Sequence, residues 1–281
     1  MRVLVTGHRG HVGVHVAEFL RGQGCEVTGF DRADGDDLLD AVAVRRAMAG
    51  CAAVVHLGAL AHDTAGSPEQ IMATNVLGTW HVLLAAGQAG LERVVHCSSA
   101  QVFGTAEGER LPSYLPVDDE HPRLATRPYG LSKKLGEDLC EGFTRRTGIP
   151  AIALRPVLVT VPGQAEQIAA GWRAEPRREY EPFWEFGGFV DVRDVATAVH
   201  RALTVPLAGH HRVLLAADGI AATAPALTMA ARLAPTVPVR HPERWADDPW
   251  RALIDASAAR RLLGWRPEHD WPRPGRGDTR T

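Results

Sequence analysis

The chain has 281 residues, of which 45% are hydrophobic and 23% are charged, and its formal net charge is -2. This size and composition suit a globular protein with a substantial core, and the near-neutral charge excludes a protein that collects nucleic acid by its electrostatic field. The four scattered cysteines lack the paired spacing of a metal site or a disulfide framework. No apolar run is long enough for a membrane span or a signal peptide, so we expect a cytoplasmic protein with no metal and no membrane or nucleic-acid partner.

Short β-rich runs alternate with longer segments of helical periodicity in the first half of the sequence. Strands are expected at 3–5, 25–30, 53–57, 93–97 and 151–154, and helices at 11–21, 75–86 and 129–146. Nearly continuous apolar strands separated by helices predict a parallel sheet that is covered on both faces. Right-handed crossovers then give a doubly wound α/β fold of the Rossmann type.

The pattern loosens after Pro156, where residues 162–188 are rich in Pro, Gly, Arg and Glu. Helical periodicity returns at 190–203 and 255–263. We therefore expect three parts: a dinucleotide-binding core at 1–156, a small C-terminal substrate-binding region at 157–271 that interleaves with the core around 189–203, and a disordered tail at 272–281.

A glycine-rich turn, Thr6-Gly7-His8-Arg9-Gly10-His11-Val12-Gly13, follows the first strand and opens the first helix. This is the context that dinucleotide binding requires. Gly7 permits the tight turn, Gly10 the approach of the pyrophosphate, and Gly13 the close packing of helix on strand. The helix N-terminus adds amide groups and the positive end of a dipole. A turn that is merely tight is the alternative interpretation.

Asp31 closes the second strand at about the distance where a carboxylate binds the adenosine ribose hydroxyls. A carboxylate at that place repels a 2′-phosphate and therefore favours NAD. Arg9 in the glycine turn and Arg32 after the acid point the other way, because either one could reach a 2′-phosphate. The prediction is NAD, with NADP as the open alternative.

Tyr129 and Lys133 lie four residues apart on a predicted helix, so that the phenol and the ammonium share one face. A free tyrosine has a pKa of about 10, too high for a base at neutral pH. A close ammonium and an oxidised nicotinamide both favour the phenolate, so we expect a lowered pKa and an acid/base role for Tyr129. An ordinary amphipathic helix is the alternative.

Ser98 and Ser99 follow the fourth strand, at the sheet edge where ligands of open α/β sheets bind. A serine there can hydrogen-bond the reacting oxygen and stabilise developing charge. For Ser98, capping of the turn is the preferred interpretation. His56 and His96 are interpreted as buried, hydrogen-bonded histidines.

Asp191 and Asp194 precede or open a predicted helix, and N-capping is the simplest explanation for both carboxylates. Neither is expected to be catalytic.

The sequence resembles the NAD-dependent epimerase/dehydratase family of extended short-chain dehydrogenases/reductases over roughly residues 1–203, with a further similarity at 255–267. The motifs that carry the resemblance are the glycine turn, Asp37-Leu38, His56-Leu57-Gly58-Ala59, Asn75, residues 98–104, Tyr129 with Lys133, and residues 189–195. The resemblance implies an NAD(P)-dependent enzyme with a Rossmann-type core.

Roles for individual residues are also implied by the resemblance. Tyr129 would be the catalytic acid/base, Lys133 would bind the nicotinamide ribose and tune Tyr129, and Ser99 would hold the substrate oxygen. Tyr129 and Lys133 would share the binding of the cofactor with Gly7, Arg9, Gly10, His11, Val12, Gly13, Asp31, Arg32, Asp37, Leu38, Leu57, Gly58, Ala59, Asn75, Pro156 and Val157. The substrate would contact Ser99, Ala100, Gln101, Leu158 and Trp184.

The chain departs from family members that use nucleotide sugars, which continue the fifth strand with Arg-x-x-Asn-x-x-Gly-Pro. Here Leu158 replaces the asparagine and Val161 the glycine, and the segment from Leu158 to Phe189 is short for a site that encloses a nucleotide. We therefore expect an NAD(P)-dependent oxidoreductase that interconverts a secondary alcohol and a ketone on a small sugar, sugar acid or natural-product intermediate. The alternatives are a nucleotide-sugar epimerase or dehydratase and a non-catalytic dinucleotide sensor. A homodimer through the helices at 76–86 and 131–145 is expected.

Overall fold

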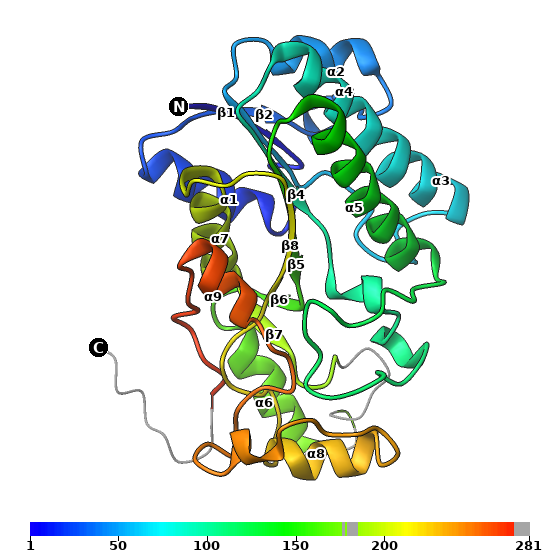
Figure 1. The fold of residues 1–281 in the computed structure, drawn as a ribbon, viewed down its shortest axis with the longest axis vertical. Helices are drawn as coiled ribbons and strands as arrows, with labels where there is room; N and C mark the ends of the chain where they lie inside the picture. The colour runs from blue at the N-terminus through cyan, green and yellow to red at the C-terminus, as the bar shows by residue number, and fades with distance from the viewer. Residues whose placement is uncertain (176–177, 179–184, 273–281) are drawn as a thin grey trace.

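A six-stranded parallel sheet forms the centre of the computed structural model, which describes residues 1–175, 178 and 185–272 (Figure 1). Its strands, in spatial order, are β2 (Glu26–Phe30), β1 (Arg2–Thr6), β3 (Ala53–His56), β4 (Arg93–Cys97), β5 (Ala151–Pro156) and β8 (His210–Leu215). The chain moves outward from β1 to β2 and then crosses to β3 on the other side of β1. The predicted doubly wound sheet is confirmed, and its ligand crevice is expected beyond the carboxyl ends of β1 and β3.

Helices cover both faces of this sheet. α1 (Gly13–Gly22) and α7 (Val192–Thr204) pack on one face, whereas α2 (Ala41–Met48), α4 (Gly78–Ala89) and α5 (Pro128–Thr147) cover the other (Figure 1). Strand β1 shows why its sequence is continuously apolar: Val3 and Val5 join the core on the α1 side, and Leu4 joins the core on the α2 side. Each such fully buried side chain contributes roughly 1.5–3 kcal/mol of hydrophobic stabilisation.

A smaller layer lies beyond the carboxyl ends of the main strands, in the lower part of Figure 1. It contains a two-stranded parallel sheet that the sequence did not predict, and several helices. These elements are β6 (Leu158–Thr160), β7 (Phe189–Asp191), α6 (Gln164–Ala174) and α8 (Ala226–Leu233). The short helix α9 (Ser257–Leu263) returns to pack beside β8 and α7. The division at residue 156 stays a prediction, but α7 and β8 show that the second part supplies elements of the main layers.

Asp191 and Asp194 have different roles at the start of α7. Asp191 accepts a hydrogen bond from the Arg193 amide at 2.9 Å, which confirms it as the N-cap. The prediction is wrong for Asp194, whose buried carboxylate instead accepts hydrogen bonds from the amides of Glu268 and His269, each at 3.0 Å. The reason is a contact between distant parts of the chain: the C-terminal segment lies against the first turn of α7, and the backbone amides of that segment need acceptors there.

Among the described residues, no helix combines the length and the apolarity that a membrane crossing needs. The same residues contain no group of three or more His, Cys, Asp or Glu side chains placed to hold a metal ion.

Candidate active site

One large cavity of about 1130 Å³ opens at the carboxyl ends of the main strands and extends from the glycine turn to the first turn of α5. Of the predicted cofactor residues, it is lined by Gly7, Arg9, Gly10, His11, Val12, Gly13, Asp31, Arg32, Asp37, Leu38, Leu57, Gly58, Ala59, Tyr129, Lys133, Pro156 and Val157. Three predicted substrate residues, Ser99, Gln101 and Leu158, line it as well. Asn75 and Ala100 lie behind this lining, and Trp184 lies outside the described residues.

The backbone of the glycine turn packs against its neighbours as closely as the predicted roles require. Gly7 has a φ of +70°, and a Cβ there would lie 2.7 Å from the Gly58 backbone. A Cβ on Gly13 would lie only 1.9 Å from the Gly7 carbonyl oxygen. At Gly10 a Cβ would lie 3.2 Å from the Gly7 carbonyl oxygen, which is a tight contact, and Gly10 itself lines the cavity. The turn therefore fits a dinucleotide, whose pyrophosphate needs bare backbone at the N-terminus of a helix.

At the adenosine end of the cavity, Asp31 joins the glycine turn to the end of β2. Its Oδ2 accepts a hydrogen bond from the Arg9 amide at 3.0 Å, and its Oδ1 accepts one from the Ala33 amide at 2.9 Å. The carboxylate is thereby fixed where a ribose would lie in a fold of this type.

At the other end of the cavity, Ser99, Tyr129 and Lys133 come together. These residues are 7%, 8% and 5% exposed, and Tyr129 and Ser99 are hydrogen-bonded to each other. Lys133 Nζ donates a hydrogen bond of 2.8 Å to the carbonyl oxygen of Cys97 and lies 5.7 Å from the centre of the Tyr129 ring. The arrangement combines a proton donor, a hydroxyl and an ammonium in a nearly dry environment, where electrostatic interactions are strong.

The pKa of Tyr129 is raised in the protein without a cofactor. Burial raises the pKa of the phenol, and the negative charges of Glu185 and Asp63 act in the same direction, whereas the hydrogen bond with Ser99 lowers it. Burial also lowers the pKa of Lys133. Desolvation of the phenolate is thus the largest effect on this pKa in the protein without a cofactor. The lowering expected from Lys133 together with an oxidised nicotinamide stays a prediction.

The N-terminus of α5 is held by a residue that the sequence analysis missed. Asp63, in the loop after β3, accepts a hydrogen bond of 2.8 Å from the Tyr129 amide and forms an ion pair of 2.9 Å with Arg127. Pro128 occupies the first helical position, where its fixed φ suits the start of a helix. No local signal marks Asp63, because the helix that it caps, α5, begins far away in the sequence.

Asn75 supports this end of the site from behind. It lies in a π-helical turn (Ala73–Leu77) that follows α3 (Pro68–Met72) and precedes α4. Its amide group forms hydrogen bonds of 2.8 and 3.0 Å with the Leu60 backbone and donates one of 2.9 Å to the Ser132 hydroxyl. Asn75 therefore ties the loop after β3 to the helix turn that carries Lys133, while its contact with the cofactor stays a prediction.

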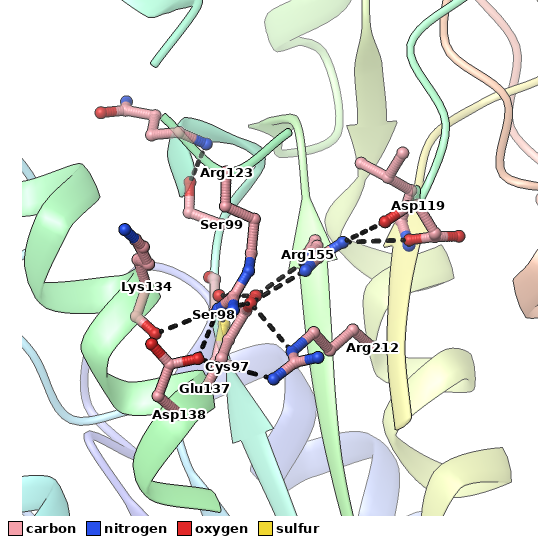
Figure 2. A network of polar contacts seen from close by, with 12 residues as sticks. Cys97, Ser98, Ser99, Asp119, Arg123, Lys134, Glu137, Asp138, Arg155 and Arg212 are labelled. Atoms are coloured by element: carbon pink, nitrogen blue, oxygen red, sulfur yellow. Dashed lines mark hydrogen bonds and ion pairs between the residues drawn. The ribbon is translucent and has the colours of Figure 1, made fainter. Parts of the chain in front are cut away.

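A buried polar cluster underlies the reacting end (Figure 2). Ser98 donates a hydrogen bond of 2.7 Å to Glu137, and Arg155 donates two to the same carboxylate, at 2.7 and 2.9 Å. Burial raises the pKa of Glu137, but its bonds with Arg155 and Ser98 outweigh this effect, and the pKa is lowered. Ser98 is thus not a turn cap as predicted, because the buried carboxylate is its stronger acceptor.

The two strand-end histidines have different environments. His56 forms hydrogen bonds with Thr6 at 2.7 Å and Thr79 at 2.9 Å, as expected for a buried histidine. The expectation is wrong for His96, whose two ring nitrogens have no hydrogen-bond partner. Its ring fills space left by a glycine on α5, since a Cβ on Gly136 would lie 2.7 Å from its Nε2. Burial lowers the pKa of His96 well below its usual value, so it is neutral.

The chain is similar to known proteins over most of its length. Residues 3–216 match the family model described as "NAD dependent epimerase/dehydratase family". A uronate dehydrogenase of Pseudomonas syringae pv. tomato is 28% identical over 221 residues, which cover 74% of this chain and 72% of the relative. A UDP-glucose 4-epimerase of Rhizobium meliloti is 25% identical over 316 residues, which cover 95% of this chain and 93% of the relative.

Solved structures agree with these matches. A short-chain dehydrogenase/reductase superfamily protein from Agrobacterium tumefaciens, with bound NAD, has a TM-score of 0.71 and 26% identity, with 96% of this chain and 94% of that chain covered. MoeE5 in complex with UDP-glucuronic acid and NAD has a TM-score of 0.69 and 25% identity, with 96% and 95% covered.

Proposed function

This chain belongs to the NAD-dependent epimerase/dehydratase family, and we propose that it is an NAD-dependent oxidoreductase that interconverts a secondary alcohol and a ketone on a small sugar, sugar acid or natural-product intermediate. The observation that carries the proposal is the convergence of Ser99, Tyr129 and Lys133 at one end of a cavity whose other end holds the glycine turn and Asp31. The same cavity thus offers both a dinucleotide site and a group for proton transfer.

Each of the three residues has a distinct task in this proposal. When bound in this cavity, a nicotinamide would supply or accept the hydride. Tyr129 exchanges a proton with the substrate oxygen through its Oη, and Ser99, which is hydrogen-bonded to that phenol, orients the same oxygen. Lys133, fixed on the Cys97 carbonyl, places a positive charge beside the reacting centre. Because the pKa of Tyr129 is raised, the phenol is protonated at neutral pH and suited to give its proton to a ketone oxygen.

The lining of the cavity supports a small substrate. Val157 and Leu158 give an apolar wall beside Tyr129, and Leu158 stands where nucleotide-sugar enzymes of the family carry an asparagine. The cavity is close to the upper end of the usual size for small-molecule sites, about 1,000 Å³, and suits a dinucleotide together with a compact second substrate. The relative named uronate dehydrogenase fits this substrate class.

A second candidate, a nucleotide-sugar epimerase, is favoured by one observation. The UDP-glucose 4-epimerase relative matches this chain over 95% of its length, further than the uronate dehydrogenase does. In that reaction the same proton transfer at Tyr129 would serve a transient oxidation, with no net change of the cofactor.

The experiment that separates the two candidates is a substrate panel with NAD⁺. Galacturonate, glucuronate, galactose, glucose and UDP-glucose are each incubated with the protein, while NADH absorbance and, for UDP-glucose, the formation of UDP-galactose are followed. Net NADH from a free sugar or sugar acid supports the dehydrogenase. Formation of UDP-galactose at constant absorbance establishes the epimerase instead.

Replacement of Tyr129 tests the proposed mechanism with whichever substrate is found. Tyr129→Phe removes only the hydroxyl, and we expect turnover to fall about 10²- to 10⁴-fold, the usual contribution of a general acid/base. The affinity for NAD⁺, measured by calorimetry, should change less than about twofold, because binding depends mainly on contacts elsewhere in the cavity. Wild-type turnover by this variant would refute the assignment of Tyr129.

Two further expectations belong to the proposal. Trp80 and Leu77 are large, exposed hydrophobic residues at the α4 face, and Arg146 of α5 lies 5.8 Å from the centre of the Trp80 ring. A homodimer through α4 and α5 would cover this face, and sedimentation velocity of the protein and of Trp80→Glu tests it.

All four cysteines are free thiols, which supports a reducing compartment such as the cytoplasm.

A further inference from the structure

Arg9 is the residue of the glycine turn that could bind a 2′-phosphate, but its guanidinium already has a partner. Arg9 Nη2 forms an ion pair of 2.5 Å with Oδ1 of Asp34, and the other carboxylate oxygen of Asp34 lies 3.2 Å from His8 Nε2. Arg9 lines the cavity, whereas Asp34 is not among the residues that line it. Two consecutive side chains of the glycine turn are therefore held by one carboxylate.

The backbone around Asp34 keeps this carboxylate in place. Asp34 ends a 3₁₀ turn (Arg32–Asp34) that Asp31 caps by accepting the Ala33 amide, and Gly35 closes the turn with a φ of +88°. In addition, the amide of Asp31 donates a hydrogen bond of 3.1 Å to Asp36. The backbone of Asp34 is thus held in place by a short, hydrogen-bonded turn.

The His8 contact has its own structural basis in β2. Gly29 lies under the His8 ring, where a Cβ would come within 2.4 Å of the ring carbon Cε1. Glycine at this position leaves the space that the imidazole needs to reach Asp34. The link from the glycine turn to Asp34 is therefore built by the turn after β1, by Gly29 of β2 and by the turn after β2.

We propose that Asp34 is a positioning residue for cofactor selection: by pairing with Arg9 it neutralises the cation of the glycine turn and leaves Asp31 to select NAD over NADP. The inference rests on the proposed function, since it requires that the cavity bind a nicotinamide dinucleotide. A 2′-phosphate would have to displace Asp34 from Arg9 and would be repelled by Asp31 and Asp34 together. NAD, which has no phosphate there, meets no such competition.

The charge state of the pair agrees with this role. The hydrogen bond with Arg9 lowers the pKa of Asp34, and the same bond raises the pKa of Arg9, so both groups stay charged at neutral pH. Because the pair is partly exposed, its influence should weaken as salt is added. Salt dependence therefore distinguishes an electrostatic role from a merely structural one.

The test measures the dissociation constants of NAD⁺, NADP⁺ and 2′,5′-ADP by calorimetry, so that no substrate is needed. The variants are Asp34→Ala, Asp34→Asn, Arg9→Ala and the Asp34→Ala/Arg9→Ala pair. Glu18→Ala is the matched control, because it removes one exposed negative charge from α1 outside the cavity.

We expect Asp34→Ala to tighten NADP⁺ and 2′,5′-ADP about three- to tenfold, in the range of exposed ion pairs and a removed repulsion, with NAD⁺ changed less than about twofold. Asp34→Asn should act in the same direction. The gain should become much smaller when Arg9→Ala is added, because only the removed repulsion by Asp34 then remains. It should also shrink in 0.5 M salt, where the Debye length is about half its value at physiological salt. Glu18→Ala should leave the ratio of NAD⁺ to NADP⁺ affinity unchanged.

Two outcomes overturn the inference. One is unchanged NADP⁺ affinity in Asp34→Ala while NAD⁺ still binds, and the other is a gain of the same size with and without Arg9. If the unaltered protein binds neither dinucleotide, the proposed function itself fails, and this result is distinct from both.

Discussion

The two ends of the cavity hold their charged groups in opposite ways. At the adenosine end, Arg9 and Asp34 meet at a surface where their side chains are 57% and 31% exposed. At the reacting end, Glu137 is fully buried, and its partners Ser98 and Arg155 are almost completely buried too (Figure 2). Its two further partners, Arg123 and Arg212, are 24% and 25% exposed. Exposed ion pairs contribute little to stability, whereas removing one partner of a buried pair is strongly destabilising.

This difference indicates at which end of the cavity substitutions can be made without loss of the fold. Glu137 connects three elements of the reacting end: α5, which carries Tyr129 and Lys133; the end of β4 at Ser98; and β5 through Arg155. Charges at the adenosine end connect only a turn to a loop. Cofactor preference should therefore be adjustable by single substitutions, while the reacting end should tolerate few.

The strongest test of this comparison is Arg155→Met. It leaves the buried Glu137 carboxylate with Ser98, Arg123 and Arg212 as its remaining partners, and we expect the free energy of unfolding to fall by about 2–3 kcal/mol. Urea denaturation at neutral pH measures the change. The double variant Arg155→Met/Glu137→Leu should recover part of the loss, because no buried carboxylate is then left short of donors; a loss below about 1 kcal/mol in the single variant would show that Arg155 does not hold the cluster together.

The pH dependence of stability gives a second test at the same cluster. Burial raises the pKa of Asp119, which contacts Arg155, to about 7 from its model-compound value of 3.8. A carboxyl group whose pKa is raised on folding stabilises the folded state below pH 3.8, and this contribution is lost as the pH rises towards 7.

The measurement compares the protein with Asp119→Asn. The variant should become more stable relative to the unaltered protein between about pH 4 and 7, by roughly 1 kcal/mol per pH unit, the slope for one proton. Asp119→Asn keeps an oxygen for the Leu214 amide, which donates to Oδ1 at 2.7 Å. Unfolding free energies that run parallel with pH in the two proteins would contradict the assignment.

A pair of glycine substitutions on α1 sharpens the comparison at the adenosine end. Gly13→Ala places a Cβ 1.9 Å from the Gly7 oxygen, so we expect a loss of about 1–3 kcal/mol and weaker NAD⁺ binding. Gly22→Ala, on the same helix, meets no atom within 4 Å and should stabilise by about 0.5–1 kcal/mol. Thermal unfolding with and without NAD⁺ measures both effects, and equal behaviour of the two variants would remove the packing argument for Gly13.

The smallest effect is expected for Asp34→Asn. Since the pair with Arg9 is exposed, the unfolding transition should coincide with that of the unaltered protein within experimental error, in contrast to Arg155→Met. A clear loss of stability would mean that the adenosine end is as rigidly built as the reacting end.

The main sheet and the glycine turn were predictable because their signals are local. Parallel strands buried on both faces are continuous apolar runs in the sequence. The spacing of Gly7, Gly10 and Gly13 is enough to predict a tight turn between a strand and a helix. The strands β6 and β7 were missed because three residues each are too short to show a period.

The site was less predictable where one group depends on distant partners. The roles of Ser98 and Asp63 come from contacts 39 and 66 residues away, and no local pattern announces them. The raised pKa of Tyr129 in the protein without a cofactor has a related cause: the sequence shows the ammonium four residues away, but not the burial of the phenol.

The buried carboxylate of Asp194 also bears on the order in which the chain becomes complete. Its backbone donors, Glu268 and His269, lie 74 and 75 residues later in the sequence. During synthesis α7 therefore emerges from the ribosome well before the amides that donate to the Asp194 carboxylate. This part of the core is complete only when the C-terminal segment has been made. A nascent chain halted before residue 268 should remain a target for chaperones and proteases even though every strand of the main sheet has been made.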